Sequence, residues 1–243
     1  NWADRKHHRL EREVLTHADR VVTVSWSWAK DLEALGAKNV EVITNGYDRD
    51  DVPQDPLPVD DRFSLVHIGS MSATRDLPGV WRALAAIGQQ DPEFRERFVL
   101  RFVGPVDHSV VESATAAGLG NHIERLGRVS HAEAMHQMQR ARVLLLPIND
   151  TPKSAGILPG KLYEYLSVGR PILAVGPSTG DVARVLGDAY PVFPYAPDSA
   201  HHGRIRRLFN HHTTTGQDID VYDRRTLAHA MAQLLQGQEA ARA

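Results

Sequence analysis

The chain has 243 residues, of which 42% are hydrophobic and 24% are charged, and its 28 Lys and Arg side chains nearly balance its 30 Asp and Glu side chains. This composition is typical of a folded globular protein and excludes a disordered chain or a coiled-coil rod. A net charge of -2 provides no general field for a polyphosphate backbone. We therefore expect no nucleic-acid partner, and any anion must be bound by local groups.

The sequence contains no cysteine and no long apolar run. Without cysteine the chain cannot form a disulfide or a thiolate zinc site, which fits a reducing compartment. Apolar runs such as 143–146 are far shorter than the roughly 20 residues that a membrane span needs. We therefore expect a soluble, cytoplasmic protein. Because the chain begins at Asn1 and not at a methionine, we also expect it to be part of a longer protein.

The first part of the chain predicts a helix, a strand, a helix and a strand. Leu10, Val14 and Leu15 have the spacing of one helical face, which predicts a helix over 2–18. The next elements are a strand over 20–24, a helix that begins after Ser25 and stops at Gly36, and a strand over 40–43. Residues 48–61 are acidic and rich in proline, which is typical of an exposed connection. We place a domain boundary there.

Beyond this boundary, short apolar runs alternate with helical stretches. The predicted strands are 63–68, 99–103, 123–126, 143–148 and 171–175, and the predicted helices are 78–89, 109–117, 132–141, 159–168, 180–186 and 223–235. This alternation predicts an α/β fold, a Rossmann-like, doubly wound parallel sheet with helices on both faces. The expected division is a first part over 1–47, a Rossmann-like domain over 48–222, and a C-terminal helix and tail over 223–243.

Ligands of such sheets bind at the carboxyl ends of the strands, so the loops after Ile68, Val103, Leu126 and Ile148 are expected to form the site. The standard dinucleotide fingerprint and the P-loop are both absent from the sequence. Four histidines, His201, His202, His211 and His212, lack the pattern of a zinc motif, and we expect no functional metal.

The strongest local signal is the stretch 156–166, GILPGKLYEYL, a glycine-containing loop that follows a buried strand and opens a helix. Free backbone N–H groups at such a helix start attract anions. Lys161 adds a positive charge, and Glu164, three residues later on the same face, can accept hydrogen bonds from hydroxyl groups. This pair fits a phosphate joined to a sugar. The same spacing also fits a capped helix with an ion pair between Lys161 and Glu164.

A second candidate is the stretch 69–76, GSMSATRD, directly after a predicted strand. Gly69 permits close approach of the backbone to a ligand, and Arg75 offers a planar set of donors that suits phosphate. A surface loop in which Arg75 pairs with Asp76 is the alternative interpretation.

Taken together, several stretches resemble family 4 (group 1) glycosyltransferases of the GT-B fold. They occur in the family's order at 17–25 (HADRVVTVS), 45–48 (NGYD), 69–75 (GSMSATR), 127–130 (GRVS) and 159–173 (PGKLYEYLSVGRPIL). The resemblance implies two Rossmann-like domains that face a cleft, with the nucleotide-sugar donor on the C-terminal domain and the acceptor on the N-terminal one. The chain then contains the donor-binding domain and only the end of the acceptor domain.

The resemblance also implies roles for single residues. Arg75 and Lys161 would be catalytic, because they would stabilise the leaving diphosphate, and Glu164 would bind the ribose hydroxyls. The other expected donor-binding residues are Gly69, Ser70, Gly104, Arg128, Val129, Gly156, Ile157, Leu158 and Gly160.

Two positions depart from the family's pattern. Ser70 stands where an arginine is common, and Gly156 stands where a glutamate would face the donor sugar. Asn149 or Asp150 would have to replace that glutamate. The expected activity is sugar transfer with retention, without a cofactor or a divalent metal. A nucleotide-sugar epimerase and a non-catalytic nucleotide-sugar-binding module are the alternatives.

The expected partners are a nucleotide-sugar donor and a glycan, lipid-linked or small-molecule acceptor. The full-length protein would then act in the cytoplasm, in part at the inner face of the membrane. Because the acceptor-side groups lie mostly outside the chain, we expect this chain to bind donor without turning over acceptor. Apolar surface left by the absent part of the acceptor domain also favours self-association.

Overall fold

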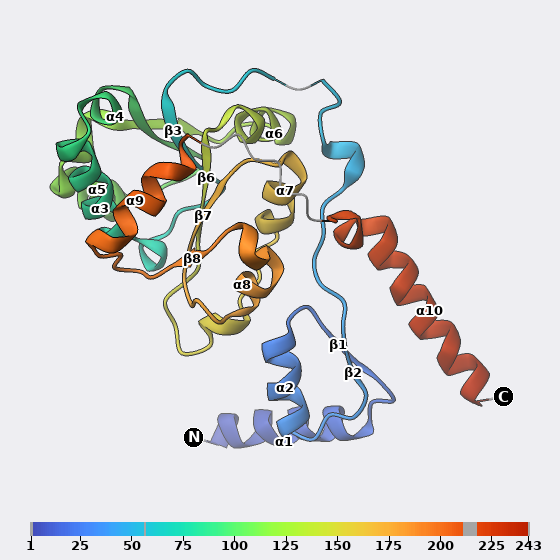
Figure 1. Cartoon of the computed structure of the whole chain (residues 1–243). Helices are drawn as coiled ribbons and strands as arrows, with labels where there is room; N and C mark the ends of the chain where they lie inside the picture. Colours follow the sequence, from blue (N-terminus) through green and yellow to red (C-terminus); the bar gives the residue numbers. More distant parts are fainter. Residues whose placement is uncertain (1, 56, 211–217, 243) are drawn as a thin grey trace.

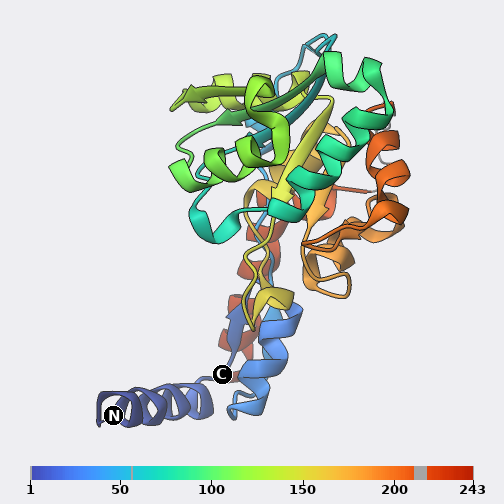
Figure 2. The same cartoon turned by 90° about the vertical axis from the view of Figure 1, so that its left-hand side faces the viewer.

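The computed structural model describes residues 2–55, 57–210 and 218–242. The described strands form two separate parallel sheets, one of two strands and one of six. Figures 1 and 2 show the small N-terminal sheet and its helices beside a larger α/β body, with a long C-terminal helix projecting from the larger body on the same side. Within the described residues, no helix is both long and apolar enough to cross a membrane.

The N-terminal part consists of α1 (Trp2–His17), β1 (Val21–Thr23), α2 (Trp26–Ala34) and β2 (Val40–Val42). The predicted cap is confirmed, because the Ser25 hydroxyl accepts a hydrogen bond of 3.1 Å from the backbone N–H of Trp28. Gly36 follows the helix with a φ of +104°, a conformation that favours glycine. Strands β1 and β2 then pair in parallel.

The larger sheet confirms the predicted doubly wound topology. Its strands are β3 (Phe63–Ile68), β4 (Phe98–Val103), β5 (Ile123–Gly127), β6 (Val143–Pro147), β7 (Ile172–Val175) and β8 (Val192–Phe193). They lie in the order β5-β4-β3-β6-β7-β8, and the paired strands are parallel. The order reverses between β3 and β6, so the loops that follow these two strands run in opposite directions, and the ligand-binding crevice of such sheets is expected at this edge.

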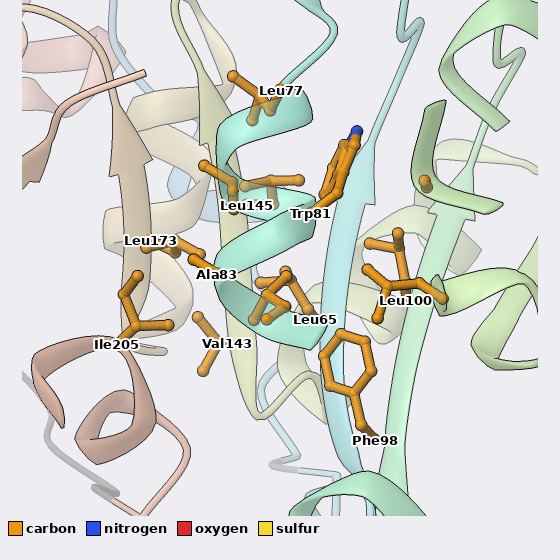
Figure 3. Packing of buried hydrophobic residues seen from close by; sticks show 14 of the residues in the cluster. Leu65, Leu77, Trp81, Ala83, Phe98, Leu100, Val143, Leu145, Leu173 and Ile205 are labelled. Carbon is orange, nitrogen blue, oxygen red and sulfur yellow. The ribbon is translucent and has the colours of Figure 1, made fainter. Parts of the chain in front are cut away.

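Helices cover both faces of this sheet. They are α3 (Pro78–Gln90), α4 (Pro92–Arg97), α5 (His108–Ala114), α6 (His131–Arg140), α7 (Lys161–Val168), α8 (Asp181–Leu186) and α9 (Ser199–Leu208). Helix α10 (Arg224–Arg242) instead projects away from the sheet (Figure 1). Figure 3 shows α3 packed on one face of the sheet, with Trp81 over β3 and Ala83 beside Leu173 of β7. A second apolar cluster, which includes Val66 and Leu162, fills the other face. Each fully buried large apolar side chain contributes about 1.5–3 kcal/mol.

Three elements were not predicted: α4, β8 and α9. Helix α9 lies in the histidine-rich patch, where polar and charged residues mask the helical spacing of the buried Ile205 and Phe209. The predicted helix over 109–117 is α-helical only to Ala114 and continues as a π-helical segment over Thr115–Leu119, in which Gly118 has a φ of +96°. His211 and His212, two of the four histidines for which no metal site is expected, lie outside the described residues.

The segment that leads into the larger body and the segment that leads out of it to α10 lie side by side at Tyr47 and Tyr222. The backbone N–H of Tyr47 donates to the carbonyl of Tyr222 at 3.1 Å, and the N–H of Arg224 donates to the carbonyl of Tyr47 at 3.0 Å. A Cβ atom on Gly46 would lie 2.2 Å from the Tyr222 carbonyl oxygen, so only glycine permits this close pairing. The Asn45-Gly46 motif thus joins the start of α10 to the segment after β2.

Candidate functional site

Two glycines shape the loops at the carboxyl ends of β3 and β4. Gly69 has a φ of +88° and donates its N–H to the carbonyl of Val103 at 2.8 Å. Gly104 has a φ of +129°, and a Cβ atom there would lie 2.6 Å from the carbonyl oxygen of Gly69. The two loops therefore meet backbone to backbone, which leaves their outer surface open to a ligand.

A groove of about 470 Å³ opens over these loops and the loop after β5. Its lining consists of Ile68, Gly69, Ser70, Val103, Gly104, Pro105, Arg128, Val129, Ser130, His131 and Ala134. The structure thus brings together a group of the predicted donor-binding residues from three loops, namely Gly69, Ser70, Gly104, Arg128 and Val129.

Lys161, the first residue of α7, reaches back to the end of β3. Its Nζ donates to the carbonyl of Ile68 at 2.5 Å and lies 3.4 Å from Nε2 of His67. A Cβ atom on Gly69 would be 3.3 Å from this Nζ, so the ammonium group lies directly beside the groove. Burial, together with the nearby Arg75 guanidinium, lowers the pKa of Lys161 to about 8. Lys161 points to β3, and the structure shows no ion pair between it and Glu164 among the described residues.

Arg75 is held between the loops that follow β3 and β6. Its Nε donates to Oδ1 of Asn149 at 2.8 Å, and its Nη1 donates to the carbonyl of Ser70 at 3.1 Å. Asp76 does not pair with it, since the Asp76 carboxylate accepts hydrogen bonds from Trp81 Nε1 and the Leu77 N–H. The guanidinium is therefore oriented at the crevice before any ligand binds.

Glu164 lies one helical turn beyond Lys161 on α7 and is half-buried. Within the described part of the chain, no hydrogen bond or ion pair engages its carboxylate. Its negative charge acts on Lys161 by raising the pKa of that side chain against the larger effect of burial. The carboxylate remains available for hydroxyl groups of a ligand.

Gly156, Ile157, Leu158 and Gly160 are not part of the groove's lining, and Gly160 is exposed directly before α7. A Cβ atom on Gly156 would lie 2.3 Å from both Cδ1 and Nε1 of Trp28, which belongs to α2. Leu158 is buried in the apolar cluster of the sheet. The predicted helix start at Pro159 is also displaced, since α7 begins at Lys161.

Two residues that the structure connects to this region were not predicted from the sequence. His67 is fully buried in β3, and the only available signal was a polar residue in an apolar strand. Asp181, at the start of α8, accepts hydrogen bonds from the Ser25 hydroxyl at 2.6 Å and from the Ser27 N–H at 3.0 Å. No local pattern could have paired α8 with α2.

The described residues contain no group of three or more His, Asp or Glu side chains arranged to hold a metal ion. Of the four histidines considered in the sequence, His201 lies 2.6 Å from the carboxylate of Asp198 at the start of α9.

Several solved structures share the fold of this chain. Sucrose-phosphate synthase from Thermosynechococcus elongatus is 17% identical with a TM-score of 0.70, and the match covers 98% of this chain and 63% of that one. A TarM variant from S. aureus in complex with UDP is 12% identical, with a TM-score of 0.68 and coverage of 94% and 46%. AviGT4, a glycosyltransferase of avilamycin A biosynthesis, is 18% identical, with a TM-score of 0.67 and coverage of 92% and 67%.

The chain thus spans from 46% to 67% of the length of these structures. A search of curated proteins finds no match. The family model described as "Glycosyl transferases group 1" matches residues 62–236, which is most of the chain. The protein therefore belongs to the group 1 glycosyltransferases, and its six-stranded parallel sheet is that of a GT-B glycosyltransferase domain.

Proposed function

We propose that this chain is the donor-binding half of an enzyme that transfers a sugar, of the hexose type, from a nucleoside-diphosphate sugar to an acceptor with retention. One observation carries the proposal: Lys161 and Arg75 come from the loops on either side of the sheet's reversal point and lie together beside Gly69. Two cations at this position match the charge of a diphosphate, and the family membership of the chain supports this ligand class.

Both cations are held in place by the protein itself. Asn149 and the Ser70 carbonyl orient Arg75, and the Ile68 carbonyl orients Lys161. Groups that are fixed in advance stabilise developing negative charge without a cost of reorganisation. As the bond between the sugar and the diphosphate breaks, the charge that appears on the leaving oxygen would meet a guanidinium and an ammonium. No metal ion or organic cofactor is required by this arrangement.

The nucleoside would occupy the groove that runs from Gly104 to Val129. In this proposal the backbone of Val129 meets the base, and Arg128 lies at the groove's edge. Glu164 accepts the ribose hydroxyls, because its carboxylate is half-buried and has no hydrogen-bond donor among the described residues. Two hydroxyls that share one carboxylate would give a bidentate contact.

The donor sugar must be recognised differently from the family's usual pattern. Trp28 fills the space in front of Gly156, so a glutamate does not fit there in this arrangement of the two sheets. The side-chain amide of Asn149 is already hydrogen-bonded to Arg75 and Thr74. We therefore assign the contact with the sugar to the neighbouring, exposed Asp150.

The acceptor would be a glycan, a lipid-linked intermediate or a small molecule, and the groups that bind it would lie largely outside this chain. We infer that the full-length protein works in the cytoplasm, in part at the inner face of the membrane. The chain alone would bind donor without transferring the sugar. Exposed apolar side chains such as Val14, which is 66% exposed, would promote its self-association.

Calorimetry or a thermal shift with UDP, GDP, ADP and their sugar conjugates tests the proposal. We expect one diphosphate class to stabilise the chain, and Lys161→Ala and Glu164→Ala to remove that effect. Lys153→Ala is the matched control, because Lys153 is exposed and pairs with Asp31 outside the groove. If every nucleotide fails to bind a folded wild-type chain, the proposal is wrong.

The glycine at position 156 favours a second candidate, a module that binds a nucleotide sugar without transferring it. Transfer assays on a longer protein that contains both complete domains distinguish the two functions. Binding without turnover would support the non-catalytic module, whereas release of an epimerised nucleotide sugar would identify an epimerase.

A further inference from the structure

His67 is a fully buried histidine near the end of β3, directly before Ile68. Its Nδ1 lies 3.2 Å from the carbonyl oxygen of Leu145 on β6, and its Nε2 lies 3.4 Å from Nζ of Lys161 on α7. The ring therefore connects the two strands of the reversal point to the helix that provides the candidate diphosphate-binding lysine.

The partners determine which nitrogen carries the proton. A carbonyl oxygen can only accept, so the Leu145 carbonyl requires a proton on Nδ1. Nε2 of a neutral ring then has a free lone pair and accepts from the Lys161 ammonium. The carbonyl oxygen of Ser70 lies 3.4 Å from Nε2. Both atoms are acceptors in this tautomer, so no hydrogen bond forms between them.

The surroundings oppose a positive charge on this ring. The charged groups that face it are Lys161 on α7 and Arg75 on the loop after β3, and both are cations. Tyr165 of α7 donates its hydroxyl to the same Leu145 carbonyl, and Phe102 of β4 lies edge-on to the ring. Burial and the nearby Lys161 lower the pKa of His67 to about 3, which supports a neutral ring.

We propose that His67 is a positioning residue: with the Ile68 carbonyl, its Nε2 holds the Lys161 ammonium beside Gly69, where a donor diphosphate would bind. Two of the three ammonium protons are then used inside the protein, and the third is left for the ligand. The identity of the ligand in this proposal rests on the proposed function. The arrangement of His67 and Lys161 itself does not.

The tautomer can be tested without a ligand. Long-range ¹⁵N NMR of the wild-type chain should show His67 as a neutral ring with the proton on Nδ1, unchanged from about pH 5 to about pH 7, where Lys161 keeps its ammonium charge. The ¹³Cε signal of Lys161 should shift in His67→Leu and return toward its wild-type position in His67→Gln, whose side-chain oxygen can replace Nε2. A proton on Nε2, or an unchanged Lys161 signal in His67→Leu, would overturn the proposal.

Binding then tests the role toward the phosphates. The probe is the diphosphate among UDP, GDP and ADP that binds the wild-type chain, compared with its nucleoside. His67→Leu should weaken diphosphate binding about tenfold or more and leave nucleoside binding unchanged, whereas His67→Gln should stay within about threefold of the wild type. The affinity of His67→Leu for the diphosphate should also depend on pH differently from that of the wild type, because Lys161 would titrate in a new environment.

Two outcomes separate this proposal from the proposed function. If the wild-type chain binds none of the nucleotides, the proposed function fails, and the role of His67 toward a diphosphate fails with it. If the wild-type chain binds a diphosphate and His67→Leu binds it equally well, only the role of His67 fails. Equal losses of nucleoside and diphosphate binding in His67→Leu and His67→Gln would show a merely structural role and would also overturn it.

Discussion

The carboxylate of Asp181, at the start of α8, accepts hydrogen bonds from Ser25 and Ser27 at the start of α2 in the N-terminal part. It accepts a hydrogen bond of 2.6 Å from the Ser25 hydroxyl, and the same hydroxyl caps α2 by accepting from the Trp28 N–H. A buried carboxylate at a helix N-terminus interacts with both the free N–H groups and the positive end of the helix dipole. This contact therefore connects the larger body to the N-terminal elements.

Replacement of this carboxylate should loosen the N-terminal elements. Asp181→Ala removes an acceptor for Ser25 and Ser27, and we expect a loss of about 1–3 kcal/mol in the free energy of unfolding. Chemical denaturation measures the loss, and hydrogen exchange should show faster exchange in α2. Asp188→Ala is the control, because Asp188 is exposed in the loop after α8. Equal stability of the two variants would contradict the assigned role of Asp181.

A side chain at position 156 should conflict with Trp28. Gly156→Ala places a methyl group 2.3 Å from the indole ring, and we expect a cost of about 1–3 kcal/mol in denaturation experiments. In a Trp28→Ala background the same change should cost much less, because the conflicting ring is gone. Gly160→Ala serves as the control, since a Cβ atom there meets no other atom within 4 Å. Additive costs in the double variant would show that the indole is not the obstacle.

The buried His67 should make the chain sensitive to mild acid. Because burial lowers its pKa from 6.5 to about 3, the unfolded state binds more protons than the folded state between these values. Stability therefore rises with pH across this window and falls as the pH drops below 6.5, by up to about 1.4 kcal/mol per pH unit. The difference in unfolding free energy between the wild type and His67→Gln, measured against pH, isolates this contribution. A constant difference would argue against a neutral buried histidine.

Lys161 should increase the affinity for a diphosphate and lower the free energy of unfolding. Its pKa is lowered from 10.5 to about 8, so the folded state carries a cost for the buried charge at neutral pH that disappears as the pH rises through this window. Lys161→Met should raise the stability by about 1–3 kcal/mol at neutral pH and abolish diphosphate binding. Lys153→Met, at an exposed position, should change the stability by less than about 0.5 kcal/mol. A destabilised Lys161→Met variant would be inconsistent with a costly buried ammonium.

The candidate site was only partly accessible to sequence reasoning. Glycines after strands and a lysine at a helix start are local signals, and Gly69 and Lys161 were found through them. The packing role of Gly156 could not be found in this way, because its neighbour Trp28 comes from a remote helix. His67 was overlooked because one polar residue in an apolar strand does not reveal whether a buried partner exists.

The alternation of strands and helices, and hence the doubly wound sheet, could be predicted from the sequence, because apolar runs and caps act over a few residues. Strand β3 was predicted with its observed bounds, and Ser25 was predicted as the cap of α2. The partners of the charged groups, in contrast, could not be predicted, because they come from distant parts of the chain. Arg75 bonds to a residue 74 positions away, Lys161 to one 93 positions away and Asp181 to one 156 positions away. Such contacts depend on how the sheet and helices pack, since the hydrogen bonds that close them form only between groups that folding brings within about 3 Å.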